Sequence, residues 1–282
     1  MNDLPDRAAA FLALHVPGTP LLLPNPWDAG SARLLQALGF RALATTSGGF
    51  AGARGCTDGS VSRDEALAHA REVVDAVGRP VSADLENAFA DDPAGVAETV
   101  RLAGETGLAG CSVEDWDPLR ERTYAFDLAV ERVVAAAEAA HTGPHRLVLT
   151  ARADAHFHGA RDPEDLDETI RRLQAYERAG ADVLYAPAVS SENGIRRILG
   201  AVSLPVNVLA LPDTPPVDRL AELGVARIST GSGMFWAAMG GLVAAASELR
   251  DAGTYAFWDS VTPARRAAAE AFTDDRGGRP AL

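Results

Sequence analysis

The chain has 282 residues, of which 47% are hydrophobic and 23% are charged. These are ordinary proportions for a globular protein, and the length fits one (β/α)-type domain of about 250 residues with short extensions. The formal net charge of −13 at pH 7 argues against nucleic acid or an anionic membrane as a partner. The two cysteines, Cys56 and Cys111, exclude a disulfide-rich secreted fold.

The sequence contains no lysine, so all 26 basic residues are arginine. This composition excludes the enzyme classes that depend on a lysine, namely Schiff-base aldolases, PLP enzymes and P-loop NTPases. An enzyme that acts on carbonyl compounds with this composition needs a metal ion or general acid–base groups.

Neither end of the chain carries a visible targeting signal. Residues 1–7 are polar and acidic, unlike a signal peptide. No apolar run approaches the roughly 20 residues of a membrane helix. We therefore expect a soluble, cytoplasmic protein without membrane contact.

Short apolar runs alternate with amphipathic stretches along the chain, after a leading helix at about Pro5–Leu14. The predicted strands are Leu21–Pro24, Ala42–Thr45, Val81–Ala83, Gly110–Val113, Leu147–Thr150, Val183–Tyr185, Val206–Leu209 and Ala226–Ser229. The predicted helices lie near residues 29–38, 62–77, 93–105, 126–140, 163–179, 192–200 and 217–223. Asp92 and Asp162 each precede a proline and should cap the helix that follows.

Eight such units predict an α/β fold of the closed (β/α)8 TIM-barrel type, with a doubly wound open sheet as the alternative. Two more helices, about Gly233–Ala252 and Ala256–Phe272, complete a single domain over residues 1–272. The first of them is so apolar that it should pack under the barrel or against a partner subunit. We expect residues 273–282 to form a flexible tail.

Carboxylates follow two neighbouring predicted strands, at the end of a barrel where active sites form. Asp84 and Glu86 are two residues apart, so they point the same way while the chain is extended. Glu114 ends the next strand. Converging carboxylates repel unless a cation lies between them, and oxygen ligands suit Mg²⁺ or Mn²⁺. In the alternative interpretation Asp84 caps the next helix and Glu114 pairs with Arg152.

Arg152 follows the fifth strand and could bind a substrate carboxylate through its guanidinium fork. An inter-strand ion pair is the alternative. Residues 46–49 read Thr-Ser-Gly-Gly, and their small side chains and free N–H groups suit an anionic oxygen.

Several of these segments together resemble the isocitrate lyase/phosphoenolpyruvate mutase superfamily. Residues 81–86 (Val-Ser-Ala-Asp-Leu-Glu) resemble its metal-binding strand, and residues 112–115 (Ser-Val-Glu-Asp) resemble its next acidic strand end. Residues 150–155 (Thr-Ala-Arg-Ala-Asp-Ala) are similar to its substrate-arginine segment. Residues 25–33, 47–49, 55–58 and 205–207 fall in the same order and spacing, so the resemblance covers roughly residues 20–235.

The resemblance implies a barrel that assembles as a homotetramer by exchanging a C-terminal helix. It implies Mg²⁺ and a small 2-oxo or 2-hydroxy (di)carboxylic acid as substrate, with a C–C or P–C bond made or broken through an enolate. Asp84 would bind the metal directly, with Asp58, Glu86 and Glu114 holding metal-bound waters. The remaining expected site residues are Ser47, Gly48, Gly49 and Arg152 on the carboxylate, Asn207 and Trp27 in the pocket, and Asp58, Arg152 and Tyr124 as catalytic groups.

The loop after the fourth strand departs from that family. The lyase branch has Lys-Lys-Cys-Gly-His there, with the cysteine as proton donor or acceptor, whereas residues 116–124 read Trp-Asp-Pro-Leu-Arg-Glu-Arg-Thr-Tyr. The asparagine of the phosphonate branch is absent too, and residues 186–188 lack the glutamate of the lyase branch. These differences argue against isocitrate or methylisocitrate lyase activity, and they leave Arg120, Arg122 and Tyr124 at the lid position.

Three functions remain open on the sequence. The first is a Mg²⁺-dependent lyase that cleaves a C–C bond or decarboxylates its substrate. The second is phosphonopyruvate-type P–C chemistry with Asp58 as nucleophile or water-positioning group. The third is a catalytically silent barrel that serves as a binding module. Cys56, His156 and His158 could be acids or ligands, although loop positions without a chemical role are the simpler interpretation, and Cys111 should lie in the core.

Overall fold

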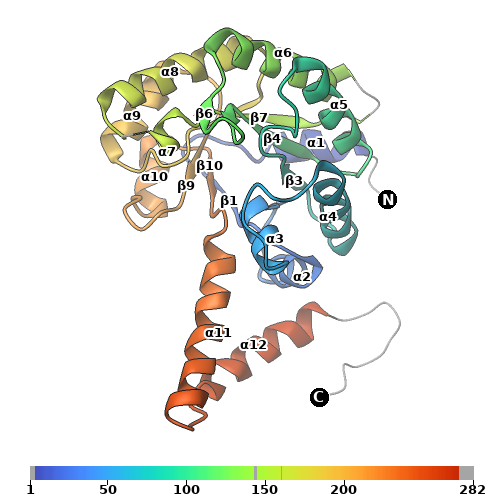
Figure 1. Ribbon diagram of the computed structural model, residues 1–282, viewed down its shortest axis with the longest axis vertical. Coiled ribbons are helices and arrows are strands. Elements are labelled where there is room, and N and C mark those ends of the chain that lie inside the picture. Colours follow the sequence, from blue (N-terminus) through green and yellow to red (C-terminus); the bar gives the residue numbers. More distant parts are fainter. Residues whose placement is uncertain (1–3, 143–144, 160, 273–282) are drawn as a thin grey trace.

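The computed structural model describes residues 4–142, 145–159 and 161–272 (Figure 1). Its main sheet has eight strands, all parallel, in the order β1-β10-β9-β8-β7-β4-β3-β2. The strands are β1 (Leu21–Leu23), β2 (Leu43–Ala44), β3 (Val81–Asp84), β4 (Gly110–Glu114), β7 (Val148–Arg152), β8 (Val183–Tyr185), β9 (Val206–Leu209) and β10 (Arg227–Ser229). Ala44 N–H donates to the Pro24 carbonyl at 3.1 Å and joins the first and last strands of that order. The predicted (β/α)8 barrel is confirmed, and the open doubly wound sheet is excluded.

Helices surround the sheet at the predicted places. They are α2 (Ala29–Ala37), α4 (Arg63–Ala76), α5 (Pro93–Gly104), α6 (Phe126–Thr142), α8 (Pro163–Arg178), α9 (Glu192–Ala201) and α10 (Val217–Leu223). Asp92 accepts from Gly95 N–H and caps α5, and Asp162 accepts from two N–H groups at the start of α8, as predicted. These side chains satisfy backbone donors that a helix start leaves without partners.

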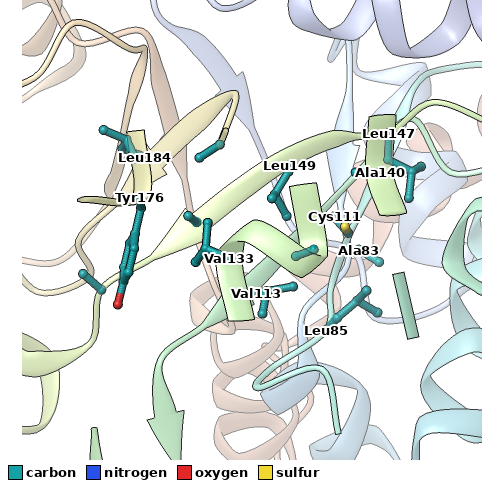
Figure 2. Close-up of a cluster of buried hydrophobic side chains, with 14 of the residues drawn as sticks. Ala83, Leu85, Cys111, Val113, Val133, Ala140, Leu147, Leu149, Tyr176 and Leu184 are labelled. Carbon is teal, nitrogen blue, oxygen red and sulfur yellow. The ribbon is translucent and has the colours of Figure 1, made fainter. Parts of the chain in front are cut away.

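The main hydrophobic core fills the space between the strands and the surrounding helices. Figure 2 shows Leu85, Cys111 and Leu149 in this cluster, together with Val133 from α6. Cys111 is fully buried, and burial raises the pKa of its thiol to about 12. It is a core residue, as the sequence predicts.

A second apolar cluster closes the amino-terminal end of the barrel. Helix α1 (Leu4–Leu12) contributes Ala8 and Phe11, which contact residues at the starts of the strands, among them Leu21 and Val148. The site is expected at the opposite, carboxyl end of the barrel.

Three short elements at the carboxyl end are absent from the prediction. These are α3 (Ser47–Ala53), α7 (Ala155–His158) and an antiparallel hairpin of β5 (Trp116–Asp117) and β6 (Arg122–Thr123). The segment 47–49, expected as an open loop, begins α3 because Thr46 caps that helix by accepting from Gly49 N–H.

After β10 the chain forms α11 (Gly233–Asp251), which extends away from the barrel, and α12 (Trp258–Ala271), which folds back toward α2 (Figure 1). Only Phe235 of α11 is buried. The alternative in which this helix packs under the barrel is therefore wrong. The tail predicted for 273–282 lies outside the described residues. Within the described residues, no helix is long and apolar enough to cross a bilayer.

Candidate functional site

A cavity of about 160 Å³ opens at the carboxyl ends of the barrel strands. Polar and charged residues from most of the strands surround it, together with a few apolar ones. Its lining includes Asn25, Thr45, Thr46, Ser47, Gly48, Asp58, Ser82, Asp84, Ser112, Arg152, Phe157, Tyr185, Asn207, Arg227, Ser229 and Ser232. The volume is below that of drug-sized ligand pockets, so the cavity suits a small ligand.

Asp84 is the carboxylate at the centre of the predicted metal site, and it lies at the end of β3. Its Oδ2 accepts from Ser47 Oγ at 3.0 Å, and its Oδ1 is 3.4 Å from Ser112 Oγ. The following helix, α5, is capped by Asp92 instead. The interpretation of Asp84 as a helix cap is therefore wrong, and its carboxylate faces the cavity.

Asp58 reaches the same cavity from the loop after α3. A Cβ at Gly48 would lie 2.9 Å from Asp58 Oδ2, so a larger residue at position 48 would force this carboxylate to shift. Burial and, next, the charge of Asp84 raise the pKa of Asp58. Two acids thus share one cavity and repel each other.

Glu86 does not share a strand face with Asp84, because β3 ends at Asp84 and Glu86 adopts a left-handed φ of 51°. The expectation from extended geometry is wrong in this respect. Glu86 lines a neighbouring cavity of about 570 Å³ beside Gly59 and the hairpin residue Leu119. Burial and then the charges of Asp84 and Asp58 raise the pKa of Glu86 to about 8.

Glu114 forms an ion pair with Arg152, with Oε2 2.9 Å from Nη1. The guanidinium fork of Arg152 faces Asp154, with Nε at 2.6 Å and Nη2 at 2.7 Å from its two oxygens. The alternative of an inter-strand ion pair is confirmed. Arg152 lines the cavity, but its donors already bind two carboxylates of the protein.

Asp154 is fixed in turn by a second buried acid, because Asp115 accepts from its backbone N–H at 2.8 Å. Asp115 in turn pairs with Arg172 at 2.9 Å and accepts from the Tyr176 hydroxyl. This buried network fixes the end of β7 and with it the position of Arg152.

The donor set suits a hard divalent cation, although the described residues contain no group of three or more acids, histidines or cysteines arranged closely enough to hold one. Mg²⁺ commonly keeps several waters and uses one or two carboxylates of the protein. Asp84 with Asp58 fits that pattern, since both line the central cavity. The mutual repulsion of these acids is what a cation would relieve.

Besides Glu86 and Glu114, three more predicted site residues lie outside the lining of the central cavity. Trp27 packs its ring against Phe235, with centroids 5.5 Å apart. Gly49 is buried at the start of α3, where a Cβ would meet Thr46 at 2.5 Å. Tyr124 is buried below the hairpin. Its hydroxyl donates to Asp91 at 2.7 Å and accepts from Asn87 at 3.0 Å.

Tyr185 and Arg227 are among the lining residues that were not on the predicted site list. Tyr185 ends β8, and burial raises the pKa of its hydroxyl to about 12. Arg227 lies within β10 and donates from Nε to Asn207 Oδ1 at 2.8 Å. Asn207 lies in the lining, where it was expected, and donates to Ser229 Oγ at 2.9 Å.

The open candidates for acids lie away from the cavity. Cys56 is exposed in the loop after α3. His158 stacks on Trp116 of the hairpin, with ring centroids 3.6 Å apart, and its Nε2 is 3.5 Å from Asp154. His156 Nδ1 is buried without a hydrogen-bond partner among the described residues.

Comparison with known proteins agrees with this architecture. The family model described as phosphoenolpyruvate phosphomutase matches residues 11–250. The chain is 31% identical to 2-methylisocitrate lyase of Escherichia coli K12 over 230 residues, which cover 77% of this chain and 75% of that enzyme. A Burkholderia cenocepacia J2315 protein of known crystal structure, provisionally classed as a lyase/mutase, is 46% identical with a TM-score of 0.90 and coverage of 97% and 98%.

A crystal structure of 2,3-dimethylmalate lyase is also similar, with 25% identity, a TM-score of 0.80 and coverage of 93% and 94%. The fold is thus that of the α/β barrels to which these lyases and mutases belong. The chain belongs to the phosphoenolpyruvate phosphomutase family, within the isocitrate lyase/phosphoenolpyruvate mutase superfamily.

Proposed function

We propose that this protein is a Mg²⁺-dependent lyase that acts on a small 2-oxo or 2-hydroxy (di)carboxylic acid through an enolate. The reaction would be cleavage of a C–C bond or loss of CO₂. Relatives named as lyases of 2-methylisocitrate and 2,3-dimethylmalate support this class of substrate.

The observation that carries the proposal is the pair of carboxylates at the cavity. Asp84 and Asp58 both line it, and neither forms an ion pair with any described residue. A divalent ion held by Asp84 would stabilise negative charge on an oxygen next to the bond that breaks. Mn²⁺ could replace Mg²⁺ with the same oxygen ligands.

The cleavage itself needs few groups from the protein. In a 2-hydroxy acid the hydroxyl loses its proton, its electrons form the carbonyl of a 2-oxo acid, and the C2–C3 bond breaks. The electrons of that bond remain on the departing fragment as an enolate, which then takes up a proton. Asp58 is the group placed to accept the first proton, and Tyr185, which remains protonated at neutral pH, is placed to supply the second.

Decarboxylation requires fewer acid–base groups from the protein, because CO₂ leaves without a proton. This simpler demand suits a chain whose lid segment carries neither the cysteine of the lyase branch nor a longer mobile loop. The β5–β6 hairpin that replaces it is held by Asp117, which accepts from Leu119 N–H and Arg120 N–H.

The test is product analysis with Mg²⁺ and a panel of malate-like acids, followed by phosphonopyruvate. The proposal predicts a 2-oxo acid from at least one malate-like acid, with activity lost on adding EDTA and in Asp84→Asn. Phosphate or phosphoenolpyruvate formed from phosphonopyruvate alone would assign the P–C alternative. No product from either series, with no Mg²⁺ binding, would leave only a binding module.

A further inference from the structure

Arg227 is a buried arginine inside the barrel, only 4% exposed, and it faces neutral partners. Its Nε donates to Asn207 Oδ1 at 2.8 Å, and its Nη1 donates to Thr150 Oγ1 at 3.1 Å. The third partner is His15, which follows α1 at the closed end of the barrel, with Nη1 3.3 Å from Nε2.

His15 is an uncharged acceptor in this contact. Its Nδ1 is 2.9 Å from the Phe11 carbonyl oxygen, which can only accept, so Nδ1 carries the proton and Nε2 is bare. Burial and, next, the positive charge of Arg227 lower the pKa of His15 to about 3. The histidine therefore brings no compensating charge to the arginine.

Among the described residues, no carboxylate forms an ion pair with Arg227. Burial lowers its pKa to about 10, so the guanidinium remains charged at neutral pH. Buried Arg172 pairs with Asp115 and Glu168, and the less buried Arg152 pairs with two acids. Among the described residues buried Arg132 also lacks a carboxylate partner, but it donates to three backbone carbonyl oxygens. A buried cation without a counter-charge is unfavourable by several kcal/mol in principle. The position of Arg227 at the cavity therefore points to a function.

Arg227 and Arg152 are the two arginines in the lining of the central cavity. The fork of Arg152 is occupied by Asp154, whereas Nη2 of Arg227 has no hydrogen-bond partner among the described residues. The cavity is thus acidic at its mouth, where Asp84 and Asp58 lie, and cationic where Arg227 lines it. A ligand that carries an anionic group at each end matches this polarity.

We propose that Arg227 is a specificity-determining residue, which binds the second carboxylate of a dicarboxylic substrate inside the barrel. The assignment rests on the proposed function for the metal-binding end of the substrate. The second carboxylate supplies the counter-charge that the protein does not provide for Arg227. The protein should therefore bind a dicarboxylate more tightly than the matching monocarboxylate.

The experiment compares malate with 2-hydroxybutanoate, which has the same carbon chain but a methyl group in place of the second carboxylate. Binding of each acid is measured by calorimetry with Mg²⁺, in the wild type and in Arg227→Met. The wild type should prefer malate by roughly tenfold or more, the usual worth of a hydrogen bond to a charged group. Arg227→Met should lose that preference.

Two further variants separate binding from structure. Thr150→Val removes one neutral partner of Arg227 and should keep the preference, while Arg227→Lys should keep part of it. Because Arg227→Met removes an uncompensated buried charge, it should not lower the melting temperature. A lower melting temperature together with an unchanged preference would show a purely structural arginine and overturn the proposal.

Oxalate distinguishes this proposal from the function on which it rests. Oxalate is too short to carry a second carboxylate deep into the barrel, so its Mg²⁺-dependent binding should be the same in wild type and Arg227→Met. Absence of that binding would count against the metal-dependent function alone. A wild type that shows no preference for malate, or that binds neither acid, overturns the role of Arg227.

Discussion

At the scale of single residues, the space beside Gly48 is filled by the carboxylate of Asp58. A Cβ at this position would lie 2.9 Å from Asp58 Oδ2. We predict that Gly48→Ala displaces Asp58 and lowers activity, or Mg²⁺-dependent oxalate binding, by roughly tenfold or more, because small displacements of reacting groups are costly. Gly200→Ala in α9 is the control, since nothing lies within 4 Å of its Cβ. Equal effects of the two substitutions would contradict the role of Gly48.

Arg152 should contribute to the stability of the folded protein through its bonds to Asp154. Lysine cannot reproduce the two parallel bonds to Asp154, whose side chain is fully buried. Arg152→Lys should therefore destabilise the protein by about 1.5 to 3 kcal/mol in urea unfolding, in addition to any loss of substrate binding. Arg171→Lys, at an exposed pair with Glu168, should change stability by less than about 0.5 kcal/mol. An unchanged free energy of unfolding in Arg152→Lys would contradict a stabilising role of the ion-pair network.

Residues that end strands were predictable because a parallel barrel directs them to one mouth. This reasoning located Ser47, Asp84, Arg152 and Asn207 in the cavity lining. It failed for Trp27, because the chain turns after the strand and carries this side chain into a packing contact. Tyr124, predicted from its place in the lid segment, instead bonds Asp91.

Arg227 was overlooked for a different reason: it is the first residue of β10, whereas the search concentrated on the carboxyl ends of the strands. A signal was present in the sequence. Arg227 and Ser229 are polar residues two apart in a short strand, a spacing that places both on the same face. One charged residue in a strand of a buried parallel sheet indicates an inward-facing role.

At the scale of elements, His69 joins α4 to the carboxyl end of the barrel. It stacks on Phe50 of α3 with ring centroids 3.9 Å apart, and its Nε2 lies 3.0 Å from the Trp27 carbonyl oxygen. Burial is the main cause that lowers the pKa of His69 to about 4. The folded protein thus holds this ring neutral under conditions in which an unfolded chain would protonate it.

This contact predicts how stability depends on pH. Between about pH 6.5 and pH 4 the unfolded state binds more protons at this site, so stability falls as the pH falls. His15 acts in the same direction. In His69→Gln the decline of the unfolding free energy across this window should be shallower than in the wild type, by up to a few kcal/mol. Identical slopes in the two proteins would show that His69 does not contribute.

The alternation of strands and helices was predictable because each βα unit repeats one apolar period and ends at a cap or a glycine. The three short elements at the carboxyl end were not. Helix α3 contains three glycines in its seven residues, which intrinsic propensity disfavours, and its start depends on the side chain of Thr46. The β5–β6 hairpin depends on Asp117 in a similar way.

At the scale of the whole molecule, the barrel has one closed end, one open end and a helix that leaves it. Helix α11 exposes Trp236, Leu242, Val243 and Leu249, each more than half accessible to solvent. Their spacing of seven residues, 236 with 243 and 242 with 249, gives two adjacent apolar stripes on one helix. We propose that this face packs against a second copy of the chain in a homo-oligomer, the tetramer that the family resemblance implies.

The proposed oligomer predicts how the molar mass in solution responds to substitutions on α11. Trp236→Asp should dissociate the assembly into smaller species, measured by size-exclusion chromatography with light scattering, because a charge would be buried at the contact. Val217→Asp on α10, where the side chain is 42% exposed, should leave the mass unchanged. A wild-type chain that runs as a monomer would refute the proposed contact.

The proposed function depends on a divalent cation held by Asp84 at the mouth of the barrel. Calorimetric titration of Mg²⁺ together with oxalate into the wild type and Asp84→Asn tests this most directly, with the exposed Asp64→Asn as control. We predict Mg²⁺-dependent binding in the wild type and in Asp64→Asn, and its loss in Asp84→Asn. Unchanged binding in Asp84→Asn, or no Mg²⁺ dependence in the wild type, would contradict a metal-dependent function that relies on Asp84.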